Sequence, residues 1–331
     1  MNIPEEPVRL KEIITPIKDD VRAFEKVFKN HLKSDIFLVD KVISYLVAHR
    51  GKRLRPIMVL LSSRLNGGEP DERRLHAAAI IELLHTATLV HDDVVDDSYQ
   101  RRGFPSINAI WKNKVSVLTG DYLFSKSLLS MLKMQDFKVF DVISRTAERM
   151  SQGELLQMER SSDYKMEEHV YFRLIGDKTA SLISAACQLG ALSANASDEE
   201  TAMMAKFGED IGLAFQIRDD LLDLLGTEKK VGKPIGNDLR ENKITLPLLH
   251  ALRNAEKKDN RKIIRMMKKG ADKKDVRYII DFIKENGGIR YATEKAASLT
   301  ADASVLLDYY PDSEYKKVLL QLVEFITSRE H

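Results

Sequence analysis

The feature that most constrains this chain is a long apolar segment that runs directly into a cluster of carboxylates. Residues 75–90 are apolar on nearly every side, which is typical of a helix buried at the centre of a bundle. Residues 91–97 follow at once and contain four aspartates. On a helix, Asp92 and Asp96 lie one turn apart on the same face. Because crowded carboxylates repel one another and lose hydration beside apolar surface, this face needs cations or a cationic ligand.

A second acidic cluster repeats the same spacing much later in the chain. Both Asp92–Asp96 and Asp219–Asp223 read Asp-Asp-x-x-Asp, and the second also lies in a helical, largely apolar pattern, over residues 199–225. Clusters of oxygen ligands favour Mg²⁺ over zinc, which prefers His and Cys ligands at fixed spacing. The sequence contains neither a Walker loop nor a GxGxxG motif, so it gives no indication of a bound nucleotide. The pattern therefore predicts a magnesium-bound diphosphate on an apolar molecule.

Several cationic segments are candidates for binding that diphosphate. Lys52 and Arg55 belong to the sequence GKRLRP at 51–56 and, being three residues apart, can point the same way. The other reading of this segment is a solvated basic loop. His85 lies two turns before Asp92 on roughly the same face, unless it is simply a core histidine. The remaining candidate cations are Arg101, Arg102, Lys178, Lys233 and Lys243.

Helical spacing dominates the whole chain, and no useful period-two alternation appears, so we expect an all-α protein with a single domain over residues 1–331. Helices are expected over 121–134, 137–150, 171–194 and 199–225. The net charge of +2 provides no strong field for nucleic acid. A single cysteine, no signal-peptide pattern and no long apolar run favour a cytoplasmic protein, with at most peripheral membrane contact for product release. The lysine-rich residues 257–274 indicate a solvated helix surface, and weak attraction to a membrane surface is the alternative.

In combination, these motifs resemble those of the trans-prenyltransferases. GKRLRP at 51–56, DDVVD at 92–96, GDKT at 176–179 and FQIRDDLLD at 215–223 occur in the order of that family. The likeness covers about residues 45 to 250 and is closest to the bacterial long-chain polyprenyl diphosphate synthases of the octaprenyl type. It implies an all-α isoprenoid-synthase helical bundle around a deep central cavity, usually a homodimer, with the two acidic helices facing each other.

The resemblance also implies a role for each motif. Isopentenyl diphosphate would be held without metal, and the allylic diphosphate would be held through about three Mg²⁺ ions. Two departures from the family pattern are mild: Asn237 stands where Asp is frequent, and Asn242 where Gly is common. The implied metal ligands are Asp92, Asp93, Asp96, Asp219, Asp220 and Asp223; the allylic diphosphate would contact Arg101, Lys178, Lys233 and Lys243; Thr179 and Gln216 would line the site near the allylic cation; and Lys52, Arg55, His85 and Arg102 would hold isopentenyl diphosphate.

The expected reaction is repeated head-to-tail condensation. Ionisation of an allylic diphosphate, such as farnesyl diphosphate, gives an allylic cation that the isopentenyl double bond attacks, and proton loss restores an allylic product. Ala87 and Thr88 lie about one turn before Asp92, where short-chain members carry an aromatic residue. Since both are small, we expect a long product, around octaprenyl, stopped by bulky side chains of the 121–134 helix.

Three other functions share part of this pattern. A shorter-chain, geranylgeranyl-type synthase and a catalytic subunit of a heteromeric synthase both remain open. A terpene cyclase is disfavoured because the second motif is an aspartate triplet, whereas such enzymes normally carry a mixed Asn, Ser or Thr, Glu motif there. The exact product length, the preferred primer and the downstream use, for instance as a quinone side chain, are left open by the sequence.

Overall fold

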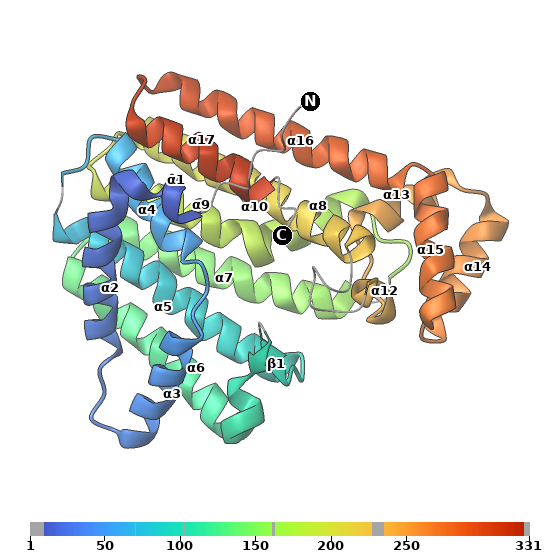
Figure 1. Cartoon of the computed structure of the whole chain (residues 1–331), viewed down its shortest axis with the longest axis horizontal. Coiled ribbons are helices and arrows are strands. Elements are labelled where there is room, and N and C mark those ends of the chain that lie inside the picture. Colours follow the sequence, from blue (N-terminus) through green and yellow to red (C-terminus); the bar gives the residue numbers. More distant parts are fainter. Residues whose placement is uncertain (1–9, 70, 102, 161–162, 227–234, 328–331) are drawn as a thin grey trace. The chain divides into compact units, whose positions relative to one another are not determined.

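The structure is a computed structural model that describes residues 10–69, 71–101, 103–160, 163–226 and 235–327 (Figure 1). Within these residues the secondary structure is helical except for one short hairpin, which confirms the all-α prediction. The chain divides into two compact units, each drawn from separate stretches of sequence and each described here by itself. The prediction of one domain over 1–331 stays a prediction. The first unit comprises Met1–Ala147, Leu182–Gly208 and Tyr310–Leu322, and the second comprises Glu148–Ser181, Glu209–Tyr309 and Val323–His331.

The first unit is organised around α5 (Glu72–Val95), the helix predicted from the apolar segment. Asp71 caps its first turn by accepting a hydrogen bond from the backbone N–H of Arg74 (3.3 Å). Buried residues then occupy every side of the helix, which packs against α2, α4 and α6 (Figure 1). The elements that lie wholly or partly in this unit are α1 (Leu10–Ile13), η1 (Thr15–Ile17), α2 (Lys18–Leu32), α3 (Phe37–Ala48), α4 (Leu54–Leu65), α5, β1 (Gln100–Arg101), β2 (Phe104–Pro105), α6 (Ile107–Met134), α7 (Phe137–Arg160), α9 (Ser181–Ser193), α10 (Asp198–Leu225) and α17 (Glu314–Thr327).

Polar contacts at both ends of α5 fix its alignment with α6. At the C-terminal end, His91 Nε2 lies 3.2 Å from the carbonyl oxygen of Val117. Nearer the N-terminal end, His31 of α2 lies between His76 Nδ1 (3.1 Å) and Ser130 Oγ (2.9 Å). Val117 of α6 lies level with His91 of α5, and Ser130, further along α6, lies level with the earlier His76. The two helices are therefore antiparallel. This alignment sets which α6 side chains lie level with each turn of α5.

A hairpin replaces the loop expected after the first acidic cluster. Its strands β1 and β2 pair antiparallel, with Arg101 opposite Phe104, and Gly103 turns the chain at a φ of 79°. The hydroxyl of Tyr45 in α3 donates a 2.6 Å hydrogen bond to the carbonyl oxygen of Pro105. Helix α6 follows and already begins at Ile107, with a non-helical kink at Lys112. The hairpin therefore holds Arg101 close to the end of α5.

The second unit contains a correction to the sequence prediction. One helix was expected over 171–194, but a π-helix, η2, interrupts it at Gly176–Ala180. The helix predicted over 199–225 is present as α10 and ends at Leu225, just before Gly226, as expected. Within this unit α13 packs against α8, α15 and α16. Its other elements are α8 (Glu168–Ile175), α12 (Asn237–Arg240), α13 (Leu246–Asn254), α14 (Lys257–Lys268), α15 (Lys273–Glu285), α16 (Gly288–Leu306) and η3 (Leu307–Tyr309).

The start of α15 and the solvent exposure of α14 both follow from local sequence. A capping box starts α15: the Asp272 carboxylate accepts hydrogen bonds from the backbone N–H groups of Lys274 (2.7 Å) and Asp275 (2.9 Å). The lysine-rich α14 buries only Ile263 and Met267, so most of its surface is open to solvent. No helix in the described part of the chain has both the length and the apolar character needed to cross a bilayer.

Candidate active site

The first acidic motif lies at the C-terminal end of α5, in the first unit. Asp92 is half-buried and Asp96 is exposed, whereas Asp93 is buried, with 3 % of its surface exposed. The predicted face formed by Asp92 and Asp96, four residues apart, is therefore accessible to a ligand. The backbone N–H of Asp96 donates to the carbonyl oxygen of Asp92 (2.8 Å), so the last helical turn continues through the motif.

Asp93 points away from that face and holds the hairpin. Its Oδ1 accepts a 2.7 Å hydrogen bond from Nε of Arg101, and its backbone carbonyl accepts from Asn108 Nδ2 (3.1 Å). Burial raises the pKa of Asp93, and the charge of Arg101 opposes this rise. Two residues with separate predicted roles, metal ligand and diphosphate ligand, thus form one ion pair in this structure.

Two of the predicted isopentenyl-binding residues, Arg55 and His85, meet at the start of α4. Nη1 of Arg55 lies 3.0 Å from Nε2 of His85, which joins two of the predicted residues across α4 and α5. Lys52 is exposed in the preceding loop. These three side chains offer the positive or hydrogen-bonding groups that an anion requires.

Arg53, between those cations, has a structural role that the sequence did not indicate. It adopts a left-handed backbone (φ 57°) and pairs with Glu82 of α5, one turn before His85. Both side chains are less than one tenth exposed, and the guanidinium also lies 4.5 Å from the ring centroid of Phe28. Only the contact reveals this role, because the motif presents Arg53 as one basic residue among three.

A hydrogen-bonded network surrounds the second acidic motif, in the second unit. Thr179 Oγ1 donates to Gln216 Oε1 (2.9 Å), and Gln216 Nε2 donates to Asp220 Oδ1 (2.9 Å). The hydroxyl of Tyr171 donates to Asp220 Oδ2 at 2.6 Å. Burial, followed by the charge of Asp238, raises the pKa of Asp220 to about 8. The predicted residues Thr179, Gln216 and Asp220 are therefore in one network.

Asp223 connects the end of α10 to α12. Its carboxylate accepts hydrogen bonds from the backbone N–H groups of Asn237 and Asp238, both at 3.1 Å. Burial and the charge of Asp238 raise the pKa of Asp223 to about 6. Asn242, in the position where the family often has Gly, has a left-handed φ of 56°, a conformation that Asn tolerates better than most residues. This departure is therefore compatible with the backbone.

Two predicted diphosphate ligands of the second unit, Lys178 and Lys243, contact carboxylates in this structure. Lys178 Nζ lies 2.7 Å from Glu154 Oε1 and donates to Gln157 Oε1 at 3.1 Å. Lys243 Nζ lies 2.7 Å from Glu241 Oε2 and 3.8 Å from Asp238 Oδ1. The side chain of Lys178, which belongs to η2, is therefore held against α7. Arg102 and Lys233, both predicted to bind diphosphate, lie outside the described residues.

The sequence missed several neighbours of these residues. Tyr171 is 49 positions from Asp220 in the chain, and no spacing rule connects a lone Tyr to a distant Asp. Asp238 and Glu154 belong to none of the motifs that the sequence singles out. The first acidic motif lies in one unit and the second in the other, so their predicted facing stays a prediction. Among the described residues, no three His, Cys, Asp or Glu side chains form a ready-made metal site.

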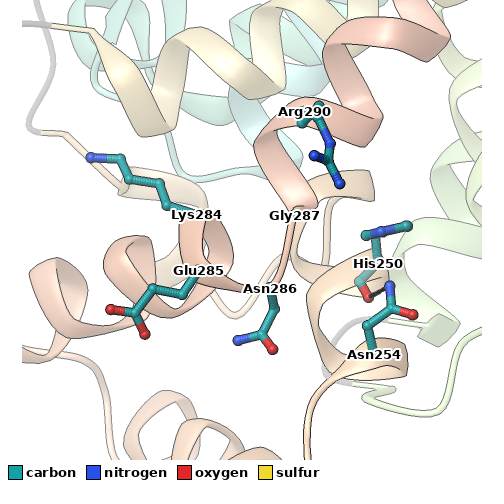
Figure 2. A pocket seen from close by; sticks show the side chains of 7 residues that line it. All are labelled: His250, Asn254, Lys284, Glu285, Asn286, Gly287 and Arg290. Atoms are coloured by element: carbon teal, nitrogen blue, oxygen red, sulfur yellow. Dashed lines mark hydrogen bonds between the residues drawn. The ribbon is translucent and has the colours of Figure 1, made fainter.

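A polar pocket elsewhere in the second unit contains none of the predicted residues. It is lined by His250, Asn254, Arg290 and residues 284–287 (Figure 2). In Figure 2 the amide of Asn254 donates to the carbonyl oxygen of His250 (3.0 Å). The His250 ring stacks on Tyr291 at a centroid distance of 4.1 Å. This pocket is separate from the motifs that define the candidate site.

An all-α chain with two Asp-Asp-x-x-Asp motifs and cationic segments beside them has the make-up of a prenyltransferase. The chain belongs to the Polyprenyl synthetase family, whose sequence model matches residues 37–283. It is a trans-prenyl diphosphate synthase, an enzyme of isoprenoid biosynthesis, as the motif order predicted.

Known relatives match this chain over nearly its full length. It is 36% identical to heptaprenyl diphosphate synthase component 2 of Geobacillus stearothermophilus, over 98% of this chain and 100% of the relative. It is 32% identical to octaprenyl diphosphate synthase of Escherichia coli (98% and 100%) and 35% identical to a short chain isoprenyl diphosphate synthase of Methanothermobacter thermautotrophicus (95% and 99%). The relatives thus span different product lengths.

A solved structure shows the same fold. The polyprenyl synthase of Caulobacter crescentus, in complex with calcium and isoprenyl diphosphate, aligns with a TM-score of 0.90 at 32% sequence identity, covering 99% of this chain and 100% of that one. The isoprenoid-synthase fold predicted from the motifs is therefore confirmed.

Proposed function

We propose that this synthase makes a long-chain, all-trans polyprenyl diphosphate of about octaprenyl length from isopentenyl diphosphate and an allylic primer such as farnesyl diphosphate. The supporting observation is Ala87, which is 1 % exposed and lies about one turn before Asp92 on α5. A growing chain that leaves the acidic face toward the start of α5 passes this residue. Because its side chain is a methyl group, it leaves room for further C5 units. Thr88, also small, is held by a hydrogen bond to the carbonyl oxygen of His85 (2.9 Å).

The antiparallel alignment of α5 and α6 refines where growth stops. His91 lies level with Val117, so Ala87, four residues earlier, lies level with the turn around Asp121. Leu132, a bulky residue of this predicted floor, is 64 % exposed and does not close an internal tunnel. Met131 is 2 % exposed and lies near the level of His76, which makes it the better candidate for the floor.

The donor set of the acidic motifs suits Mg²⁺ together with a diphosphate. Mg²⁺ in proteins is commonly held by one or two carboxylates, water and substrate phosphate oxygens. Asp92 and Asp96 would supply the first set of ligands, and Asp219, Asp220 and Asp223 the second, for about three ions. Asp93 would act through Arg101, which it holds in the hairpin. When bound, the ions supply positive charge that stabilises the departing diphosphate.

The remaining residues position the substrates. Lys178, Arg101 and Lys243, with Lys233 and Arg102 from outside the described residues, provide cations for diphosphate oxygens. The side-chain oxygens of Thr179 and Gln216 are dipoles that can stabilise positive charge on the allylic carbons. Lys52, Arg55 and His85 hold isopentenyl diphosphate. The allylic C–O bond then breaks, the isopentenyl double bond attacks the cation, and a proton passes to the released diphosphate, so no protein nucleophile is required.

The enzyme is proposed to act as a homodimer. Leu118, Leu129 and Leu132 of α6 are each more than half exposed and lie on one face, because their spacings of eleven and three residues are close to whole helical turns. Burying such a stripe against a second copy removes apolar surface from water. A catalytic subunit of a heteromeric synthase is the second candidate, favoured by the full-length similarity to a protein named heptaprenyl diphosphate synthase component 2.

One assay tests both candidates. Purified protein is incubated with Mg²⁺, farnesyl diphosphate and labelled isopentenyl diphosphate, and the products are separated by chain length. Long products from the protein alone support the proposal. Products that end at the geranylgeranyl length contradict the long-chain assignment, and no incorporation until a partner protein is added would favour the heteromeric enzyme.

A further inference from the structure

The π-helix η2 is the unusual backbone element beside the second acidic motif. It spans Gly176–Ala180, and the backbone N–H of Ser181 donates to the carbonyl oxygen of Gly176, five residues earlier. A π-turn inserts an extra residue into a helix and redirects its side chains, and such turns are frequent at functional sites. Both Lys178 and Thr179 lie inside this turn.

Close packing against two helices fixes the backbone of η2. A Cβ atom at Gly153 of α7 would lie 2.7 Å from the backbone nitrogen of Lys178. A Cβ atom at Gly212 of α10 would lie 2.5 Å from Cα of Ala180. Since real Cβ atoms do not approach so closely, both helices touch η2 only because these positions are glycine. The turn is therefore confined from two sides.

An ion-pair network joins the same three elements. The Oδ1 atom of Asp177 accepts a 2.8 Å hydrogen bond from Nε of Arg149 in α7. The Nη2 and Nη1 atoms of Arg149 donate to the two carboxylate oxygens of Glu209 in α10, at 2.7 and 3.3 Å. The side chain of Asp177 is only 12 % exposed. Burial lowers the pKa of Arg149, but its hydrogen bonds to Glu209 and Asp177 outweigh this effect, so its charge is retained. One guanidinium thus connects α7, η2 and α10.

Consecutive residues of the turn contact different partners. Asp177 reaches Arg149, Lys178 reaches Glu154, and Thr179 reaches Gln216 next to Asp220. Asp177 Oδ2 also lies 3.6 Å from Nε of Arg173 in α8, so the Arg149 contact is what ties Asp177 to α7. If that contact were lost, the turn would depend on the Lys178 side chain for its polar contacts with Glu154 and Gln157 of α7. Rotation of the turn would then carry Lys178 and Thr179 away from their present partners.

We propose that Asp177 and Arg149 are positioning residues, which hold the η2 turn so that Lys178 and Thr179 face the allylic diphosphate. The inference rests on the proposed function, because it assigns Lys178 and Thr179 to that substrate. It predicts that loss of the Arg149–Asp177 contact weakens allylic substrate use and leaves isopentenyl diphosphate binding unchanged.

The test is a double-mutant cycle with Asp177→Asn and Lys178→Met, measured with steady-state kinetics for each substrate. Asp177→Asn is expected to lower kcat/KM for farnesyl diphosphate about 10- to 100-fold, since small displacements of positioning groups have effects of this size. The KM for isopentenyl diphosphate should stay within about twofold. In the Lys178→Met background, Asp177→Asn should have a much smaller effect, because the group that it positions is already absent.

Arg145→Gln is the matched control, since Arg145 lies one turn before Arg149 on α7 and forms an exposed pair with Asp141. It should change neither KM value. Additive effects of Asp177→Asn and Lys178→Met, or equal changes for both substrates, would show a merely structural role and overturn the inference while the proposed function stands. A Lys178→Met variant with normal allylic kinetics would contradict the assignment of Lys178 to the allylic diphosphate, and with it the inference, but not the long-chain product. Arg149→Lys keeps the positive charge but loses the planar guanidinium that binds Asp177 and Glu209 at once, so it should reproduce part of the Asp177→Asn defect.

Discussion

The hydroxyl of Tyr171 donates a 2.6 Å hydrogen bond to Oδ2 of Asp220, and both residues are at least 95 % buried. Removing this donor with Tyr171→Phe would leave one carboxylate oxygen without a protein donor. A hydrogen bond to a charged group contributes about 1.5–3 kcal/mol to stability. The variant loses this full contribution only where the carboxylate of Asp220 is ionised. We therefore expect a lower free energy of unfolding by about 1–2 kcal/mol in urea titrations, and weaker metal-dependent activity.

The matched control for Tyr171→Phe is Tyr278→Phe. Tyr278 lies in the same unit but is 41 % exposed, and its ring contact with Lys262 survives in the variant. Equal stability losses in the two variants would contradict a special role for the Tyr171 hydroxyl.

The acidic face of α5 predicts strong metal dependence. Asp92→Asn and Asp96→Asn should each lower kcat by about 10²–10³-fold, because each removes charge that the proposed ions require. Removal of divalent ions with a chelator should abolish turnover, and added Mg²⁺ should restore it. The control is Asp97→Asn: Asp97 adjoins the motif, is exposed, and has a left-handed backbone that Asn accepts. A normal kcat for Asp92→Asn would exclude the proposed ligand.

The length of the prenyl product should respond to bulky substitutions at two levels of the α5–α6 pair. Ala87→Phe is expected to shorten the product most, and Ser127→Phe, on the buried face of α6 and further from the acidic motif, to shorten it less. The physical reason is steric closure of the path at different levels of the α5–α6 pair. Product sizing by chromatography measures the order. Val305→Phe, at a position of α16 that is 65 % exposed, should leave the product unchanged. The same product distribution in Ala87→Phe and the parent enzyme would remove α5 from the path of the growing chain.

His31 makes the first unit sensitive to acid. Burial, followed by the charges of His76 and Lys133, lowers the pKa of His31 to about 4. The unfolded chain has a His pKa near 6.5, so between about pH 6.5 and 4 the unfolded state binds a proton that the folded state does not. Stability from this site is complete above about pH 6.5 and falls as the pH drops toward 4. The loss should be about 1–2 kcal/mol, given that the ring is only half-buried.

Urea titrations at pH 7.5, 5.5 and 4.5 measure this loss. His31→Gln should flatten the pH dependence in that window, whereas His169→Gln, at an exposed position, should not. Carboxylates also titrate near pH 4, but they are shared by both variants and cancel in the comparison. A parallel decline in all three proteins would contradict the assignment to His31.

The sequence predicted the helical class, α5 and the two acidic motifs because each depends on local spacing. The apolar run at 75–90 was enough to predict the buried helix α5, and Gly226 was enough to predict where α10 ends. The π-turn at Gly176–Ala180 was missed because it depends on contacts from Gly153 and Gly212, which are far away in the chain. Backbone geometry of this kind is decided by tertiary packing, which residue spacing does not encode.

The candidate site was predicted as a set of residue types, but their partners were not. Asp93 was grouped with Asp92 and Asp96, yet it faces Arg101 because it lies on another side of the helix. Asp220 is buried against Tyr171, a contact across 49 residues of sequence. The roles of all these residues remain predictions that the variants above test.

The left-handed backbone of Arg53 has a consequence for engineering. A non-glycine residue in this conformation costs about 1–2 kcal/mol, and here the buried pair with Glu82 offsets that cost. Arg53→Gly alone would relieve the backbone strain but leave the buried Glu82 carboxylate without its Arg53 partner. Arg53→Gly combined with Glu82→Leu would remove both the strain and the unpaired buried charge. Laboratory selection for heat resistance alone would therefore favour the double replacement. Under the proposed binding of isopentenyl diphosphate by Lys52 and Arg55, on either side of Arg53, selection for turnover would favour the native pair, so stability and activity would favour different residues at this one loop.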